Sequence, residues 1–173
     1  MSFSTTDLNL VFENLLFLLI ATSFLVFLGW VWRLSLPFSI PQPLPAWFKA
    51  WLSIVLVVGV ALPLVAMLVW GVWWGNQSVL QATLPYFVML GFQILSESVT
   101  LNRFQSCVWV MIPCLYLPYR IWQLYRGLTL LSLDETIWVQ RLLLVEIVLW
   151  IFNYGVHLSQ LPRLLGWEVP NRE

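Results

Sequence analysis

Long apolar runs without a single charged residue constrain this chain more than any other feature. Residues 14–32 and residues 50–75 contain no Asp, Glu, Lys or Arg. The hydrocarbon core of a bilayer is ~30 Å thick, and a helix that rises ~1.5 Å per residue needs about 20 apolar residues to cross it. Both runs meet this length, so they predict transmembrane helices.

The composition places the whole chain in the same class. Hydrophobic residues make up 61% of the 173 residues and charged residues 9%, with a mean hydropathy of +0.86. A soluble domain ordinarily has about 25% charged residues. We therefore predict an all-α fold, a polytopic transmembrane helical bundle. The eight basic and eight acidic residues cancel, so no net positive charge favours a nucleic-acid partner.

The apolar runs predict five spans within a single transmembrane domain that covers residues 1–173. No positive residue precedes the first run, which favours a retained span over a cleaved signal peptide. The polar residues 76–78 predict a tight hairpin between the second and third spans, and Pro63 predicts a kink with a freed backbone carbonyl. The expected spans are approximately 12–32, 50–75, 79–100, 104–122 and 138–161.

The fourth span is the shortest of the five. Residues 104–119 give sixteen uncharged positions and contain Pro113 and Pro118. The segment can cross the membrane if the Arg120 side chain extends to the interface. Four spans plus a re-entrant or interfacial segment is the alternative.

Tryptophan positions agree with these span ends. Trp prefers the headgroup level of a bilayer. Of the twelve tryptophans, Trp109 and Trp150 lie inside spans, which predicts packing between helices. The predicted interface anchors are Trp30, Trp32, Trp47, Trp51, Trp70, Trp73, Trp74, Trp122 and Trp138.

The basic residues of the loops predict an orientation. With five spans, an outer N-terminus puts five of the eight bases on the cytoplasmic side and leaves Arg120, Arg126 and Arg141 opposite. The 33–49 loop contains four prolines, which favours an extended, semi-rigid connection.

Polar residues of the last span repeat with helical spacing. Steps of four, three, four and three place them on one stripe, which predicts a seam between helices. Arg141 points away from this stripe and lies near the headgroups. The stripe consists of Glu146, Trp150, Asn153, His157 and Gln160.

A second stripe lies on the third span. Gln93, Glu97 and Thr100 are spaced by four and three residues. In the five-span topology Glu97 and His157 both lie near the cytoplasmic side, so the two side chains can meet. Such a contact either joins helices through a charge-assisted hydrogen bond or carries a proton.

The sequence contains none of the common catalytic motifs. GxSxG, HExxH, CxxC and a glycine-rich phosphate loop are all missing, and His157 is the one histidine. Cys107 and Cys114 are seven residues apart, on one face of the expected helix, where two turns of separation prevent a disulfide. We therefore expect no enzyme, no metal and no cofactor, while contact with a pigment or lipid stays open.

A set of short patterns runs from about residue 93 to residue 162. It consists of Gln93, Ser96, Glu97, Ile112, Pro113, Tyr116, Arg120, Phe152, Asn153, Leu161 and Pro162. With these residues the chain resembles a group of small multi-span proteins shared by cyanobacteria and plant chloroplasts. The resemblance implies a photosynthetic setting, in a thylakoid or cyanobacterial cell membrane, and a role as an accessory or assembly partner.

Two functions fit these observations. The first is a non-catalytic accessory subunit or assembly factor of a larger membrane complex, with membrane lipids and other integral membrane subunits as its partners. The second is a small transporter or channel in which Glu97, Glu146 and His157 line a hydrated path. Purification in a gentle detergent separates the two, because a subunit migrates with a large complex.

Overall fold

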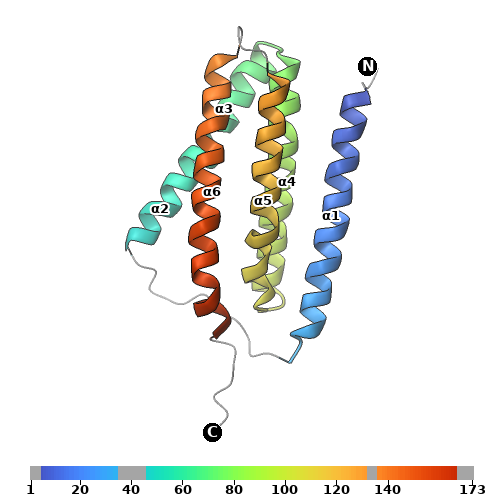
Figure 1. Ribbon diagram of the computed structural model, residues 1–173, viewed down its shortest axis with the longest axis vertical. Coiled ribbons are helices and arrows are strands. Elements are labelled where there is room, and N and C mark those ends of the chain that lie inside the picture. The colour runs from blue at the N-terminus through green and yellow to red at the C-terminus, as the bar shows by residue number, and fades with distance from the viewer. Residues whose placement is uncertain (1–4, 35–45, 132–135, 167–173) are drawn as a thin grey trace. The chain divides into compact units, whose positions relative to one another are not determined.

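The computed structural model describes residues 5–34, 46–131 and 136–166, and all regular structure in these residues is helical (Figure 1). The most N-terminal helix is α1 (Thr5–Val31). A rod of α2 (Ala46–Leu56) and α3 (Leu62–Ala66) follows, and then come α4 (Gln77–Asn102), α5 (Val108–Leu130) and α6 (Ile137–Gly166). The prediction of an all-α fold is confirmed for this part of the chain.

Four helical segments are long and apolar enough to cross a membrane, which is consistent with an integral membrane protein. They are Asn9–Val31, Ala46–Trp73, Gln77–Asn102 and Ile137–Ser159. Helix α5 is a continuous helix of 23 residues but is less apolar than these four. It begins later and ends later than the predicted 104–122 span, and most of the predicted proline-rich connection lies outside the described residues.

Cys107 lies in the turn before α5 and not in the helix, so the prediction that both cysteines share one helix face is wrong. Both thiols are free, Cys107 fully buried and Cys114 half-buried.

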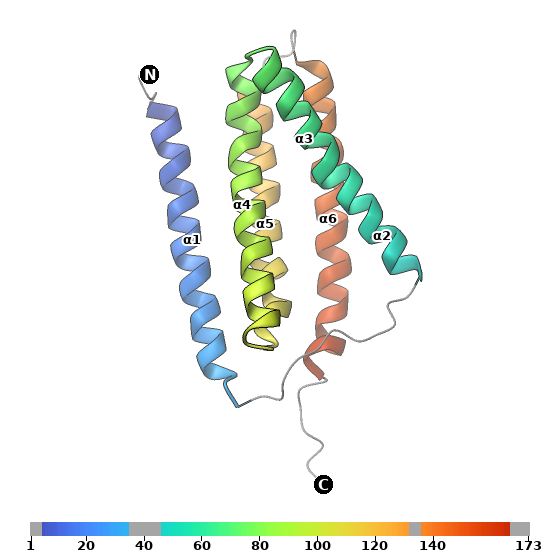
Figure 2. The ribbon, with the colours of Figure 1, turned by 180° about the vertical axis from the view of Figure 1, so that it is seen from behind.

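The rod that contains α2 and α3 has two π-helical stretches. Val57–Ala61 precedes α3 and Met67–Trp73 follows it. Pro63 lies between them, at the start of α3, where its missing N–H interrupts the regular hydrogen-bond ladder. Figure 2 shows that the rod is joined to the start of α4 through a hairpin.

Three residues stabilise the hairpin between this rod and α4. Gly75 has a φ of 70°, a left-handed conformation that favours glycine. Asn76 then caps α4, because its side-chain oxygen accepts a hydrogen bond of 3.2 Å from the Val79 N–H. An added Cβ on Gly71 would lie 2.8 Å from a Leu80 methyl carbon, so glycine allows the two arms to approach. The predicted tight hairpin is confirmed.

The described residues belong to two compact units. Unit 1 consists of Met1–Ile40, Met89–Tyr116 and Gly155–Glu173, and unit 2 of Pro41–Val88 and Leu117–Tyr154. In unit 1, the Phe17 ring of α1 meets the Tyr116 ring of α5 edge to face at 5.3 Å. In unit 2, an added Cβ on Gly127 of α5 would lie 3.2 Å from the Ala82 Cβ of α4, so these two helices are in close contact.

Candidate functional site: a buried arginine and glutamate cluster

Four buried polar or aromatic side chains of unit 2 form the candidate site. Tyr86 comes from α4, Arg120 from α5, and Glu146 and Trp150 from α6. Their exposed fractions are 1%, 2%, 0% and 3%. We call these four residues the Arg120 cluster. A charged side chain inside a membrane protein is costly, so its neighbours have to compensate it.

Arg120 is held between two aromatic rings. Its Cζ atom lies 4.2 Å from the centroid of the Trp150 ring and 5.4 Å from that of the Tyr86 ring. A desolvated cation–π contact of this kind stabilises by about 2 kcal/mol or more. The predicted extension of Arg120 to the interface is therefore wrong. Helix α5 continues to Leu130, so Arg120 lies near its middle, and the side chain is buried inside the protein and does not extend from its surface.

Glu146 supplies the carboxyl group of the cluster. Both of its carboxylate oxygens are buried, and neither has a hydrogen-bond partner in the part of the chain that the structure describes. The indole N–H of Trp150, one helical turn later, also lacks one there.

The cluster also binds the backbone of the rod. Pro63 has no N–H, so the carbonyl of Gly59, four residues earlier, loses its usual helical donor. The Tyr86 hydroxyl donates a hydrogen bond to this carbonyl. The freed carbonyl predicted from Pro63 thus has a partner from α4.

The rod and α6 approach each other closely at Gly59. An added Cβ there would lie 2.7 Å from the Cζ2 atom of Trp150 and 3.3 Å from a Leu149 methyl carbon. Any side chain at residue 59 would therefore displace the ring that covers Arg120. Trp150 contacts both residue 59 and Arg120. A side chain at residue 59 would therefore also disturb the position of Arg120.

Neighbouring contacts in unit 2 extend the cluster. The Trp51 indole N–H donates to Asn153 Oδ1 at 3.0 Å, and the Trp51 and Phe152 rings are 4.8 Å apart. The Gln123 Nε2 atom donates to the Pro85 carbonyl at 3.3 Å. Glu146, Trp150 and Asn153 of the stripe on α6 thus face other elements of unit 2, and their role as a seam stays a prediction.

The other predicted polar residues belong to unit 1. Gln93 is buried and donates from Nε2 to Glu97 Oε1 at 2.7 Å, and Thr100 is half-buried. His157 donates from Nε2 to the Val110 carbonyl at 2.9 Å. A meeting of Glu97 with His157 stays a prediction, and the side chain of Gln160 lies outside the described residues.

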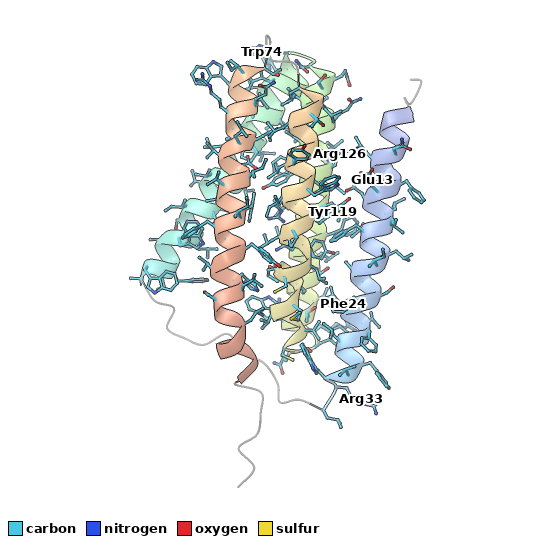
Figure 3. The ribbon with its side chains drawn as sticks, viewed as in Figure 1. Glu13, Phe24, Arg33, Trp74, Tyr119 and Arg126 are labelled. Atoms are coloured by element: carbon cyan, nitrogen blue, oxygen red, sulfur yellow. The ribbon has the colours of Figure 1, made fainter. Side chains whose placement is uncertain are left out.

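The predicted interface tryptophans fall into two groups. Trp32, Trp51 and Trp70 are half-buried. The others are at least 48% exposed, and Figure 3 shows Trp74 at the hairpin that precedes α4. Interface anchoring stays a prediction. The exposed group comprises Trp30, Trp47, Trp73, Trp74, Trp122 and Trp138.

Sequence reasoning found Glu146 and Trp150 but missed Tyr86 as a member of the site. Pro63 predicted a backbone carbonyl without its helical donor. No signal in the sequence identifies the hydroxyl that donates to this carbonyl. Among the described residues, no group of three His, Cys, Asp or Glu side chains is placed to hold a metal ion.

Residues 2–164 match the family described as "Domain of unknown function (DUF7733)", and the chain belongs to that family. No curated protein matches the chain, and no solved structure matches it either.

Proposed function

We propose that this chain is a non-catalytic integral membrane protein of five spans that serves as an accessory subunit or assembly factor of a larger membrane complex. The observation that supports this role best is the one-sided packing of α1. In the apolar part of this helix, only 6% of the residues are buried. A span that contacts so little of its own chain leaves most of its surface for other membrane components.

The two faces of α1 differ clearly. Ala21 is 2% exposed and the half-buried Phe17 contacts Tyr116, so this face packs within unit 1. Phe12, Leu19 and Val26 are 66%, 67% and 67% exposed. Their spacing of seven residues places them on one stripe, and at about 100° per residue Phe12 lies opposite Ala21. This stripe is the proposed contact with another subunit.

The resemblance to cyanobacterial and chloroplast proteins supports a photosynthetic setting, in a thylakoid or cyanobacterial cell membrane. Five spans require that α5 crosses the membrane, and its 23 residues give a length of roughly 35 Å. Tags at the two termini then lie on opposite sides of the membrane. Tags on the same side would exclude five spans.

The subunit role is tested by weakening the α1 stripe without changing its apolar character. We expect that the Phe12→Ala, Leu19→Ala and Val26→Ala triple variant still inserts but no longer migrates with a large complex in native electrophoresis. The matched control replaces Leu144, Val148 and Ile151, which are 53%, 67% and 54% exposed on α6, by alanine. If the α1 variant and the wild type migrate alike, lipid alone covers the stripe and the proposed contact is refuted.

Glu146 supports transport as the second candidate function. Glu146 is fully buried, and neither of its carboxyl oxygens has a hydrogen-bond partner among the described residues. A buried acidic side chain in a membrane helix is a common mark of an ion or proton path. In reconstituted liposomes, a transporter would show a proton or cation flux that Glu146→Gln abolishes while the protein remains folded. Equal, background-level flux from both proteins would reject this function.

A further inference from the structure

Apolar packing brings one end of α1 to the turn between α4 and α5 in unit 1. Cys107 and Val110 are both 0% exposed and form the centre of this contact. Gly29 and Val108 support the same placement, because an added Cβ on Gly29 would lie 4.0 Å from a Val108 methyl carbon. The side chains packed around the centre are Trp32, Leu101, Trp109 and Leu161.

Two arginines flank this contact. Arg33 follows Trp32 directly, and Arg103 lies two residues after Leu101. Both side chains are exposed, and Figure 3 shows Arg33 at the C-terminal end of α1. The sequence contains no basic run, and these two residues are seventy positions apart in it, yet the fold places them at the same end of unit 1. We call this pair the basic end.

The basic end lies just beyond the apolar parts of two spans. The first candidate span ends at Val31, two residues before Arg33, and the third ends at Asn102, one residue before Arg103. Side chains at such positions lie at the level of the lipid headgroups. Both arginines are therefore placed where a phosphate group of the bilayer is available.

The described surroundings of the basic end carry no negative side chain. In α1, the nearest acid is Glu13, twenty positions before Arg33 and roughly 30 Å away along the helix. In α4, the nearest acid is Glu97, six positions before Arg103, which accepts a hydrogen bond from Gln93. Within the described ranges, no carboxylate therefore neutralises the two guanidinium groups at this end.

An aromatic ring orients one of these arginines. The Arg33 Cζ atom lies 5.4 Å from the centroid of the Trp30 ring, and Trp30 is 61% exposed. A guanidinium group stacked on a ring keeps its N–H edge available for hydrogen bonds. Arginine binds phosphate oxygens through such an edge, often with two parallel bonds, while tryptophan packs at the interface.

We propose that Arg33 and Arg103 bind the phosphate of one anionic phospholipid, with Trp30 packed beside the lipid glycerol region. This lipid site is independent of the proposed subunit role and exists equally in a transporter. A lipid held between α1 and the turn after α4 clamps the most weakly packed span of the chain. An anionic lipid fits better than a zwitterionic one, because no described carboxylate is present to bind a choline group.

Spin-labelled phosphatidylglycerol and phosphatidylcholine report the preference for anionic lipid directly. The protein is reconstituted in phosphatidylcholine bilayers, and electron paramagnetic resonance gives the association constant of each labelled lipid. Each arginine near a membrane surface contributes enough for about a fivefold effect. We expect that Arg33→Gln or Arg103→Gln lowers the preference for phosphatidylglycerol about fivefold, and that the second substitution adds little to the first because both contact one phosphate.

Arg141→Gln is the matched control. Arg141 is exposed and lies 5.3 Å from the Trp138 ring centroid, so it has the same chemistry in unit 2. An equal loss of preference in this control would show a general charge effect and overturn the site. No change in the Arg33 and Arg103 variants would overturn it as well. Release of the labelled lipid by millimolar glycerol phosphate would identify a free phosphate ligand instead. Circular dichroism verifies that the variants retain their helices.

Discussion

Tyr86→Phe should destabilise the protein because it removes the donor to the Gly59 carbonyl. The change leaves the ring in place, so its cation–π contact with Arg120 and the packing volume are retained. Hydrogen bonds in membrane proteins contribute roughly 0.6–1.7 kcal/mol, and an unsatisfied buried carbonyl costs ~1–3 kcal/mol. We expect a loss of about 1–2 kcal/mol in the free energy of unfolding.

The reason for this loss can be tested by restoring the donor that proline removes. In a Pro63→Ala background, residue 63 regains an N–H that can bond to the Gly59 carbonyl four residues earlier. Tyr86→Phe should then cost less than half as much as it does in the wild type. The four proteins of this double-mutant cycle isolate the coupling, whatever the effect of Pro63→Ala alone.

Unfolding by sodium dodecyl sulfate in mixed micelles, followed by circular dichroism, supplies the four free energies. Thr83→Val is a suitable control in α4, since the Thr83 hydroxyl is buried but donates at 2.7 Å to the Val79 carbonyl of its own helix. Its cost should not depend on residue 63. An equal cost of Tyr86→Phe in both backgrounds would refute the proposed relation between Pro63 and Tyr86.

Three further predictions follow from the same contacts. Gly59→Ala should destabilise by about 1–3 kcal/mol through its clash with Trp150, whereas Gly155→Ala, with open space around its Cβ, should be neutral or stabilising in the same unfolding assay. Arg120→Gln should destabilise the protein because it removes the cation held between the Trp150 and Tyr86 rings, and adding Glu146→Gln should recover part of that loss if the two buried groups are coupled; strictly additive losses would contradict the coupling. Glu97→Gln should leave accumulation and assembly intact if Glu97 joins helices, while Glu97→Leu should lower accumulation; an abundant, assembled but inactive Glu97→Gln protein would indicate a proton path instead.

Local and periodic features of this fold could be predicted from the sequence. The spacing of Glu146, Trp150 and Asn153 indicates one face of a helix whatever that face contacts, and these residues do face other elements of unit 2. The hairpin before α4 follows from Gly75 and Asn76, whose preferences depend on their own backbone. Such predictions hold because they require no knowledge of a distant partner.

The position of Arg120 could not be predicted in this way. Its place near the end of the predicted 104–122 span suggested an extension to the headgroups, because the uncharged run in the sequence stops at residue 119. The helix continues because residues beyond Arg120 also pack inside the protein, among them Leu124, which is 1% exposed. A charge ends an apolar pattern, but it does not end a helix, because arginine is itself a good helix former.

The role of Pro63 follows from the sequence and the fold together. In water, a carbonyl freed by proline can bond to solvent, whereas in a bilayer its donor has to come from the protein. The sequence therefore requires a donor near Gly59 but permits any nearby hydroxyl, amide or indole to supply it. In the fold, the donor is Tyr86, whose ring also contacts Arg120. One side chain therefore donates to the Gly59 carbonyl and stabilises the buried Arg120 guanidinium group. Replacing Pro63 should consequently affect the Arg120 cluster, although Pro63 itself carries no polar side chain.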